Sequence, residues 1–248
     1  MKKILTLLAV CATLCSCATD WGALETVYYP INGIYTKLDI SNAFQVTVSG
    51  SETATDSGAL TAINPVASVT VGEKAHQYVQ VEVIDGTLYI GMKKWNYSAP
   101  EKGVVVLPAN TTLSLNELRV SSASSFQGTL SGDEVSMKLS GASRFEGPVH
   151  ADNTDIELSG ASDAALNGYS MEELKIHLSG ASHFDGNRFP CTHIKVKLSG
   201  ASYADVTCCE SLEADVSGGS RLTYGTPSDE CSPKIDCECS GGSTVQKR

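Results

Sequence analysis

Residues 138–147 read KLSGASRFEG, and three later stretches repeat them closely: ELSGASDAAL at 157–166, HLSGASHFDG at 177–186 and KLSGASYADV at 197–206. Looser copies of the S-G-A-S tetrapeptide begin at Ser121, Ser217 and Ser240, so the steps between successive copies are 19, 19, 20, 20, 18 and 23 residues. Self-similarity at a period near 20 residues is typical of repeat architectures, in which each unit buries its apolar side chains by stacking on its neighbours.

Apolar and charged side chains alternate in the residues before each tetrapeptide. The position immediately before it holds Val120, Leu139, Leu158, Leu178, Leu198, Val216 and Cys239. The third position before it holds Leu118, Met137, Ile156, Ile176, Val196, Ala214 and Cys237. Between these columns lie Arg119, Lys138, Glu157, His177, Lys197, Asp215 and Glu238. A period of two in all seven copies predicts a strand with one buried face.

The tetrapeptide itself predicts a bend after this strand. Its glycine suits a left-handed or closely stacked backbone, its alanine is expected to point inward, and its serines are expected to form local hydrogen bonds. A second short strand follows, with a buried ladder of Phe126, Phe145, Phe184 and Leu222 in which Ala164 and Ala204 also take part. One strand–bend–strand circuit per repeat predicts an all-β fold, a parallel β-helix or solenoid with coils of about 20 residues.

Two other repeat folds with similar periods do not fit the pattern. A leucine-rich repeat needs an L-x-x-L-x-L pattern with an asparagine ladder, and a calcium-binding nonapeptide coil needs G-G-x-G-x-D. The β-helix register also sets unlike charges side by side, namely Lys138 and Glu157, Asp155 and Lys175, Lys195 and Glu213, and Lys197 and Asp215. Each exposed pair is worth about 0.2–1 kcal/mol, so the pairs support the alignment more than the stability.

The N-terminus has the features of a bacterial lipoprotein signal. A basic start and a short apolar run lead to Leu14-Cys15-Ser16-Cys17, so residues 1–16 are expected to be removed, Cys17 to be lipidated, and residues 17–27 to form a short tether. The alternative is an ordinary secretory peptide. The mature chain carries 16 basic and 28 acidic residues, a formal charge of −12, which argues against nucleic acid or anionic lipid as a partner.

Six cysteines remain after Cys17, and all lie in the last 58 residues. In an exported protein such crowding indicates disulfides. Cys191 and Cys209 both lie eight residues before a repeat serine, so we expect them to pair, and Cys208 with Cys231 is a second candidate. Cys237 and Cys239 occupy core columns and are expected as buried thiols. The spacing of the cysteines does not favour the alternative of a zinc site, so we expect no metal.

The N-terminal half is strand-like without a regular repeat. Residues 38–48 contain a bend in which Asn42 takes the glycine position, residues 79–84 and 87–90 form a hairpin across Asp85-Gly86, and residues 104–107 form a further strand. We expect residues 28–248 to be one domain, with 28–112 supplying irregular first coils and a cap and 113–248 supplying the S-G-A-S coils. A cap would cover backbone that invites association.

This ordered series resembles the GIN-domain family, the auto-transporter adhesin heads of Bacteroidetes. The resemblance rests on Ile31-Asn32-Gly33-Ile34, on Ile40-Ser41-Asn42-Ala43-Phe44-Gln45-Val46, on Asp85-Gly86-Thr87-Leu88-Tyr89-Ile90 and on the serial S-G-A-S coils, and it covers residues 28–246. It implies a right-handed β-helix, an envelope location and an adhesive or binding role. Together with the lipoprotein signal, this location predicts a protein held at the outer membrane by its lipid anchor. It supplies no catalytic residues and no cofactor.

The column just after the tetrapeptide is the candidate binding strip, because it varies and points outward. It consists of Arg144, Asp163, His183, Tyr203 and Arg221, and these side chains suit a glycan or a protein ligand. The alternative is an ordinary solvated strand face. An enzyme acting on polysaccharides is another alternative, for which Asp163, Asp185 and Asp205 near His183 are the candidate groups. A structural or regulatory envelope protein is a third.

Overall fold

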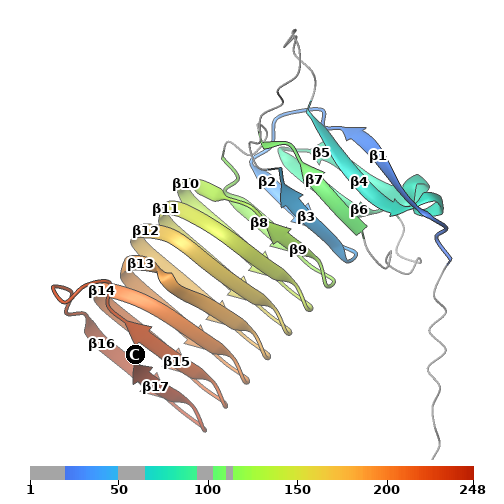
Figure 1. The fold of residues 1–248 in the computed structure, drawn as a ribbon. Helices are drawn as coiled ribbons and strands as arrows, with labels where there is room; N and C mark the ends of the chain where they lie inside the picture. The colour runs from blue at the N-terminus through green and yellow to red at the C-terminus, as the bar shows by residue number, and fades with distance from the viewer. Residues whose placement is uncertain (1–19, 50–64, 94–102, 110–113) are drawn as a thin grey trace, which may run out of the picture.

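The computed structural model describes residues 20–49, 65–93, 103–109 and 114–248 (Figure 1). In this part of the chain, strands β1 to β17 belong to one continuous sheet, and η1 is a short 3-10 helix. The predicted signal peptide and residues 17–19 of the predicted tether, Cys17 included, lie outside the described residues, and residues 24–27 of that tether belong to the first strand of the sheet.

The N-terminal half combines parallel coils with antiparallel strands. Its elements are β1 (Leu24–Pro30), β2 (Lys37–Ile40), β3 (Phe44–Val48), β4 (Val66–Gly72), η1 (Glu73–Tyr78), β5 (Val79–Ile84), β6 (Thr87–Met92) and β7 (Gly103–Leu107). Strands β2 and β3 lie parallel to β6 and β7, and antiparallel β5, β4 and β1 complete this end of the stack. The predicted hairpin is β5–β6, and Asp85 and Gly86 both have positive φ at its turn.

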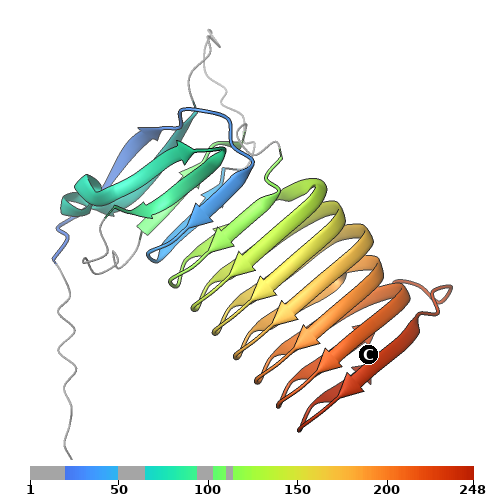
Figure 2. The same ribbon diagram turned by 180° about the vertical axis from the view of Figure 1, so that it is seen from behind.

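The C-terminal half is a stack of parallel coils (Figures 1 and 2). Its strands are β8 (Glu117–Val120), β9 (Ser125–Gln127), β10 (Leu130–Leu139), β11 (Arg144–Leu158), β12 (Asp163–Leu178), β13 (His183–Leu198), β14 (Tyr203–Val216), β15 (Arg221–Gly225), β16 (Lys234–Cys239) and β17 (Thr244–Lys247). Every pairing among them is parallel, and β8 and β9 pair with β2 and β3 of the first half. The β-helix predicted from the repeat is confirmed.

The repeated corners work differently from our expectation for the alanine. Gly141, Gly160, Gly180, Gly200 and Gly218 all have φ between +72° and +78°, as predicted. The following alanines are exposed, however, and the second serine of each tetrapeptide is buried instead. In Ser182, for example, the hydroxyl donates to the carbonyl of Ser179 at 2.8 Å, while the N–H of Ala181 donates to the carbonyl of Gly160 on the preceding coil at 2.7 Å.

The core runs through the middle of the stack as aligned columns. Successive partners in one column are Phe126, Phe145, Ala164, Phe184, Ala204 and Leu222, all at most 1 % exposed. The predicted ladder is therefore present, and its large and small side chains alternate from Phe145 onward. Phe126 and Phe145 stack with ring centroids 6.1 Å apart. This packing fixes each coil on the next and gives the outer faces a rigid support.

Candidate binding site

The strip residues form one continuous row across the stack. Arg144 pairs in register with Asp163, Asp163 with His183, His183 with Tyr203, and Tyr203 with Arg221. The Nδ1 atom of His183 lies 3.8 Å from a carboxylate oxygen of Asp163, and the His183 and Tyr203 rings are 5.0 Å apart between centroids. The strip thus brings an aromatic pair between two guanidinium groups on one accessible surface.

The next outward column of each coil, two residues after the strip, lies beside the strip. Asp185 and Asp205 are partners in register, and Asp205 is held by Arg248, whose Nη1 atom lies 3.0 Å away. Burial raises the pKa of Asp205, the nearby Arg248 opposes that shift, and Asp185 adds to it. Arg248 also donates to the hydroxyl of Thr207 at 3.0 Å. This contact of the last residue was not predicted, because no repeat column includes it.

The three candidate carboxylates do not converge on one point. Asp163 belongs to the strip column, whereas Asp185 and Asp205 belong to the next outward column. Asp185 accepts a hydrogen bond from the N–H of Asn187 at 3.1 Å, within the irregular segment of β13 between Asp185 and Pro190. Among the described residues no group of three or more His, Cys, Asp or Glu side chains could hold a metal ion.

A groove of about 670 Å³ runs along the sheet formed by β8, β10, β11, β12, β13 and β14. Its wall is the charged column that precedes the tetrapeptide, and its other lining residues include the first serine of each corner. The ionisable side chains in the lining are Asp39, Arg119, Lys138, Glu157, His177, Lys197 and Asp215. From the sequence alone, this column is expected only to form ion pairs. The signal for a groove was already present, as an outward column directly beside a bend that repeats in every coil.

The predicted charge neighbours are adjacent in register, but two of the lysines form ion pairs with a different carboxylate. Lys138 contacts Glu157 at 2.9 Å, as predicted. Lys175 and Lys195 both bind Glu173, each at 2.8 Å, although Asp155 and Glu213 are their neighbours in register. Hydrogen bonds from Lys175 and then from Lys195 hold the pKa of Glu173 below its usual value.

The charges along this face are segregated by coil. Lys175, His177, Lys195 and Lys197 on β12 and β13 form a basic block, and Glu213, Asp215, Asp236 and Glu238 on β14 and β16 form an acidic block. A second hollow of about 560 Å³ lies over both blocks. Within the described residues His177 and Lys197 make no ion pair, so both remain available to an anionic group.

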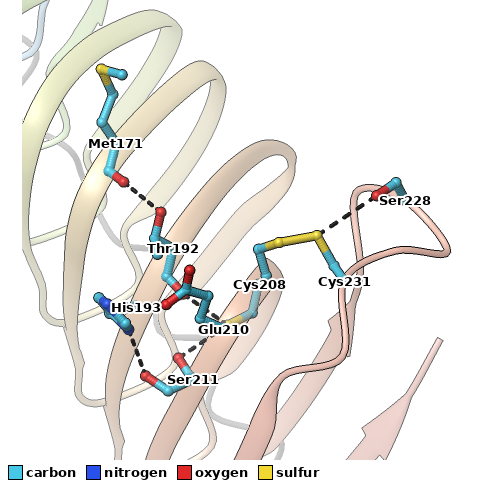
Figure 3. The surroundings of a disulfide bond; sticks show 9 residues. Met171, Thr192, His193, Cys208, Glu210, Ser211, Ser228 and Cys231 are labelled. Atoms are coloured by element: carbon cyan, nitrogen blue, oxygen red, sulfur yellow. Dashed lines mark hydrogen bonds and ion pairs between the residues drawn. A yellow bond between two sulfur atoms is a disulfide. The ribbon is translucent and has the colours of Figure 1, made fainter.

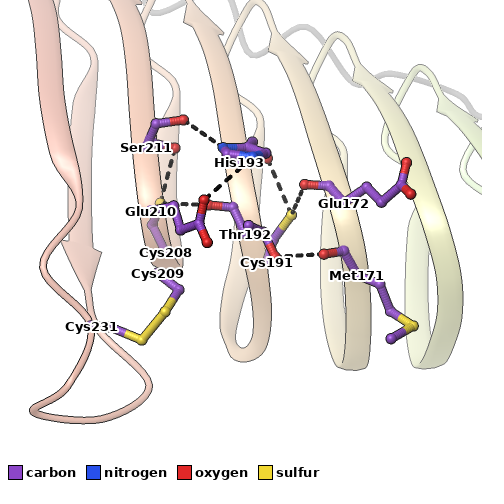
Figure 4. A network of polar contacts seen from close by, with 10 residues as sticks. All are labelled: Met171, Glu172, Cys191, Thr192, His193, Cys208, Cys209, Glu210, Ser211 and Cys231. Carbon is purple, nitrogen blue, oxygen red and sulfur yellow. Dashed lines mark hydrogen bonds and ion pairs between the residues drawn. A yellow bond between two sulfur atoms is a disulfide. The ribbon is translucent and has the colours of Figure 1, made fainter.

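The cysteines pair differently from both expected combinations. The disulfide joins Cys209 to Cys231, with a Cα–Cα distance of 4.7 Å (Figure 3). Cys191 lies opposite Cys208 in register, and both are buried thiols. Cys191 donates to the carbonyl of His193 at 3.2 Å and Cys208 to that of Ser211 at 3.0 Å, within the polar network of Figure 4. Burial raises the pKa of Cys191 to about 11.

The thiols expected to be buried at the end of the chain are less enclosed than predicted. Cys237 is half-buried and Cys239 is exposed, although both occupy core columns. Their exposure follows from their position on β16, which has a partner strand on one side only among the described residues.

Comparison with known proteins agrees with the fold. The family model described as "Putative auto-transporter adhesin, head GIN domain" matches residues 34–227. A putative adhesin from Bacteroides fragilis NCTC 9343 superposes with a TM-score of 0.74 at 17% identity, covering 91% of this chain and 97% of that one. A putative adhesin from Parabacteroides distasonis ATCC 8503 gives 0.66 at 16% identity, with coverages of 92% and 98%.

A third solved structure carries a different name. The putative lipid binding protein from Parabacteroides distasonis ATCC 8503 gives a TM-score of 0.64 at 19% identity, covering 92% of this chain and 97% of that one. No curated protein matches the chain. In the part of the chain that the structure describes, no helix has the length and apolar character needed to cross a membrane. The match to the family model spans most of the sequence, and the chain therefore belongs to the GIN-domain family of putative auto-transporter adhesin heads.

Proposed function

We propose that this chain is a non-catalytic binding head of the cell envelope, which presents one rigid β-helix face to a glycan or a protein. The groove of about 670 Å³ carries the proposal, because it crosses consecutive coils in a straight line on a packed support. Ligand sites are typically concave and preformed, and a straight groove suits an extended polymer better than a compact metabolite. The family description of adhesin heads supports the same role.

The chemistry of the groove favours a ligand with charged or strongly polar groups. Charges recur at every coil, and the strand spacing sets them about 4.8 Å apart. Positive and negative groups both line the wall. Lys138 and Glu157 are already paired, whereas His177 and Lys197 make no ion pair within the described residues. A polymer that repeats a carboxylate or hydroxyl group at a similar interval would contact several coils at once, and such contacts add through multivalency.

The strip is the second candidate surface, and the His183–Tyr203 ring pair favours it. Exposed aromatic faces flanked by Arg144 and Arg221 suit sugar rings or an extended peptide. The strip lies on the opposite strand set of each coil, so a ligand on the strip and one in the groove depend on different side chains.

Binding is tested by screening the mature domain against arrays of glycans, matrix proteins and envelope proteins. The groove variant carries Lys138→Ala, His177→Ala and Lys197→Ala, and the strip variant carries Arg144→Ala, His183→Ala and Tyr203→Ala. Each variant is the matched control for the other. We expect the groove variant to lose at least about tenfold in affinity, equivalent to about 1.4 kcal/mol, while the strip variant keeps it.

The remaining outcomes are equally informative. Loss in the strip variant alone would move the ligand to the strip, and no binding by the wild-type domain to any probe would overturn the binding role. Release of unsaturated or reducing ends from an acidic polysaccharide would show an enzyme. If Asp185→Ala abolished this release, the proposal of a non-catalytic head would be overturned.

We also infer that the head is attached to the outer membrane through lipid on Cys17. The support is the sequence Leu14-Cys15-Ser16-Cys17 after a basic and apolar leader. Labelling of the expressed full chain with a radioactive fatty acid, and its loss in Cys17→Ala, is the expected result. An unlabelled wild-type chain that is released from the cells would favour the ordinary secretory peptide.

A further inference from the structure

A buried column of small polar side chains lies midway along the long strands, away from the tetrapeptide corner. Ser170 on β12, Cys191 on β13 and Cys208 on β14 are successive partners in register, each at most 3 % exposed. Each side chain donates to a backbone carbonyl two or three residues further along its own strand, as Ser170 does to Glu173 at 2.9 Å. A serine therefore serves this local role as well as a cysteine does, and the role alone does not require sulfur.

The ladder between β13 and β14 is irregular at the two cysteines. Its register shifts twice, and only Pro190 with Thr207 and Cys191 with Cys208 are partners between the shifts. Pro190 has no N–H group to donate to the neighbouring strand. The two strands are therefore held by few backbone hydrogen bonds at this point, and a covalent link would reinforce the pairing where it is weakest.

The vicinal residues Cys208 and Cys209 point to opposite faces of β14. Cys208 is fully buried, and its Sγ atom lies 3.7 Å from the carbonyl oxygen of Thr192, the residue next to Cys191 on the preceding coil. Cys209 is half-buried and is bonded to Cys231, which precedes β16 (Figure 4). Partner Cα atoms in adjacent strands are about 4.8 Å apart, inside the disulfide range of about 4.4–6.8 Å. Cys208 is thus placed to link β14 to the coil before it, as Cys209 links β14 to the segment after it.

We propose that Cys191 and Cys208 form a second disulfide, which joins β13 to β14 inside the core. Two S–H bonds break and one S–S bond forms, and the two protons and two electrons pass to a disulfide oxidant, which leaves as two thiols. The same class of oxidant forms the Cys209–Cys231 bond. The thiols give up only weak hydrogen bonds, because S–H is a poor donor. The inference is independent of the ligand, although β13 and β14 contribute to both the groove and the strip.

The burial of both thiols determines when this bond forms. Burial raises the pKa of Cys191 to about 11 and also raises the pKa of Cys208. Since the thiolate is the reacting species, the thiol pair of the folded chain reacts slowly, and the bond forms while the coils are still assembling. Oxidant therefore has to be present during folding.

Peptide mapping of the full chain tests the proposal, after refolding with reduced and oxidised glutathione and digestion by trypsin without reduction. Cys191, the Cys208–Cys209 pair and Cys231 fall in three separate tryptic peptides, which are residues 189–195, 198–221 and 222–234. We expect the three peptides in one cluster joined by two disulfides, with a mass about 4 Da below their sum. A peptide 189–195 that carries a free thiol, or one joined to any other peptide, would overturn the proposal.

Two serine variants assign the bonds within the cluster. Cys208→Ser should release only peptide 189–195, and Cys209→Ser should release only peptide 222–234. Serine is a matched replacement for Cys208, because Ser170 occupies the same column on β12. Circular dichroism checks that each variant keeps its β structure. If Cys208→Ser released peptide 222–234 instead, Cys191 would be bonded to Cys209, and the proposed pairing would be wrong.

Discussion

Gly180 stands at a corner where backbone geometry and close stacking act together. Its φ is +75°, and a Cβ added there would lie 2.5 Å from the carbonyl oxygen of Gly160 on the preceding coil. Gly86, at the turn of the β5–β6 hairpin, has the same φ of +75°, but a Cβ there would have no neighbour within 4 Å. Gly86 is therefore required only for its positive φ, whereas Gly180 is required both for its positive φ and for the close approach of the preceding coil.

This comparison predicts the effect of adding a methyl group at each site. Gly86→Ala should cost about 1–2 kcal/mol, the penalty of a left-handed conformation, whereas Gly180→Ala should cost at least about 3 kcal/mol because the neighbouring coil must also move. Urea denaturation followed by circular dichroism measures both. Equal losses would mean that the corner stack can relax around an added side chain.

The corner also shows what the sequence could and could not predict at this scale. The recurrence of glycine indicated a positive φ, and that prediction is confirmed. The burial of the second serine was missed, because a hydroxyl is expected outside and its partner, the carbonyl of the first serine, cannot be recognised from residue type. In Ser143 that hydrogen bond is 2.7 Å long and satisfies the buried hydroxyl within its own coil.

Strands β12 and β13 are joined on their outer face through Glu173. Its carboxylate contacts Lys175 on its own strand and Lys195 on the next, each at 2.8 Å. Because its pKa is lowered in the folded state, the stabilisation is present above the unfolded value and is lost as the pH falls through the folded one. The two lysines and one carboxylate thus form a pH-dependent link between elements.

We therefore expect Glu173→Gln to lower the free energy of unfolding by about 1 kcal/mol at neutral pH. The difference from wild type should shrink in acid and disappear once the wild-type carboxylate is protonated. Denaturant titrations over a pH series measure it. Glu157→Gln is the control, because Glu157 has one lysine partner and should cost about half as much; a loss for Glu173→Gln that does not change with pH would refute the link.

The cysteine pairing shows where sequence alignment of elements fails. Counting back from the repeat serines places Cys191 beside Cys209, but the ladder between β13 and β14 shifts by one residue between Cys191 and His193. The shift brings Cys208 opposite Cys191 and leaves Cys209 free to reach Cys231. Similar irregularities interrupt the β11–β12 and β12–β13 ladders, away from the repeated tetrapeptide that marks the register.

At the scale of the molecule, the stack is a series of contacts between nearest neighbours. The regular half follows from sequence periodicity, which placed the strip and the charged column in the correct register. The depth of the groove could not be predicted, because it depends on how far the charged column lies below the neighbouring side chains. The sequence thus predicts which residues form the candidate surfaces, but it does not predict how concave those surfaces are.

Nearest-neighbour stacking predicts that one whole coil can be removed. Deleting residues 160–179 joins Ser159 to Gly180 and restores an S-G-A-S corner, with Phe145 then facing Phe184 as Phe126 already faces Phe145. The shortened chain should fold, and its longest dimension in X-ray scattering should fall by about 4.8 Å. Deleting ten residues instead is the control and should prevent folding; a misfolded one-coil deletion would show coupling beyond neighbours.

The disulfide between Cys209 and Cys231 has a consequence for the order of assembly. Cys209 is on β14, and Cys231 follows β15 and precedes β16, so in the folded chain the two sulfur atoms meet across one wound coil, 22 residues apart in sequence. Oxidation of this pair therefore works as a chemical record of completed winding. A newly synthesised chain with both thiols still reactive has not closed this coil, and trapping those thiols at intervals would time that step of folding.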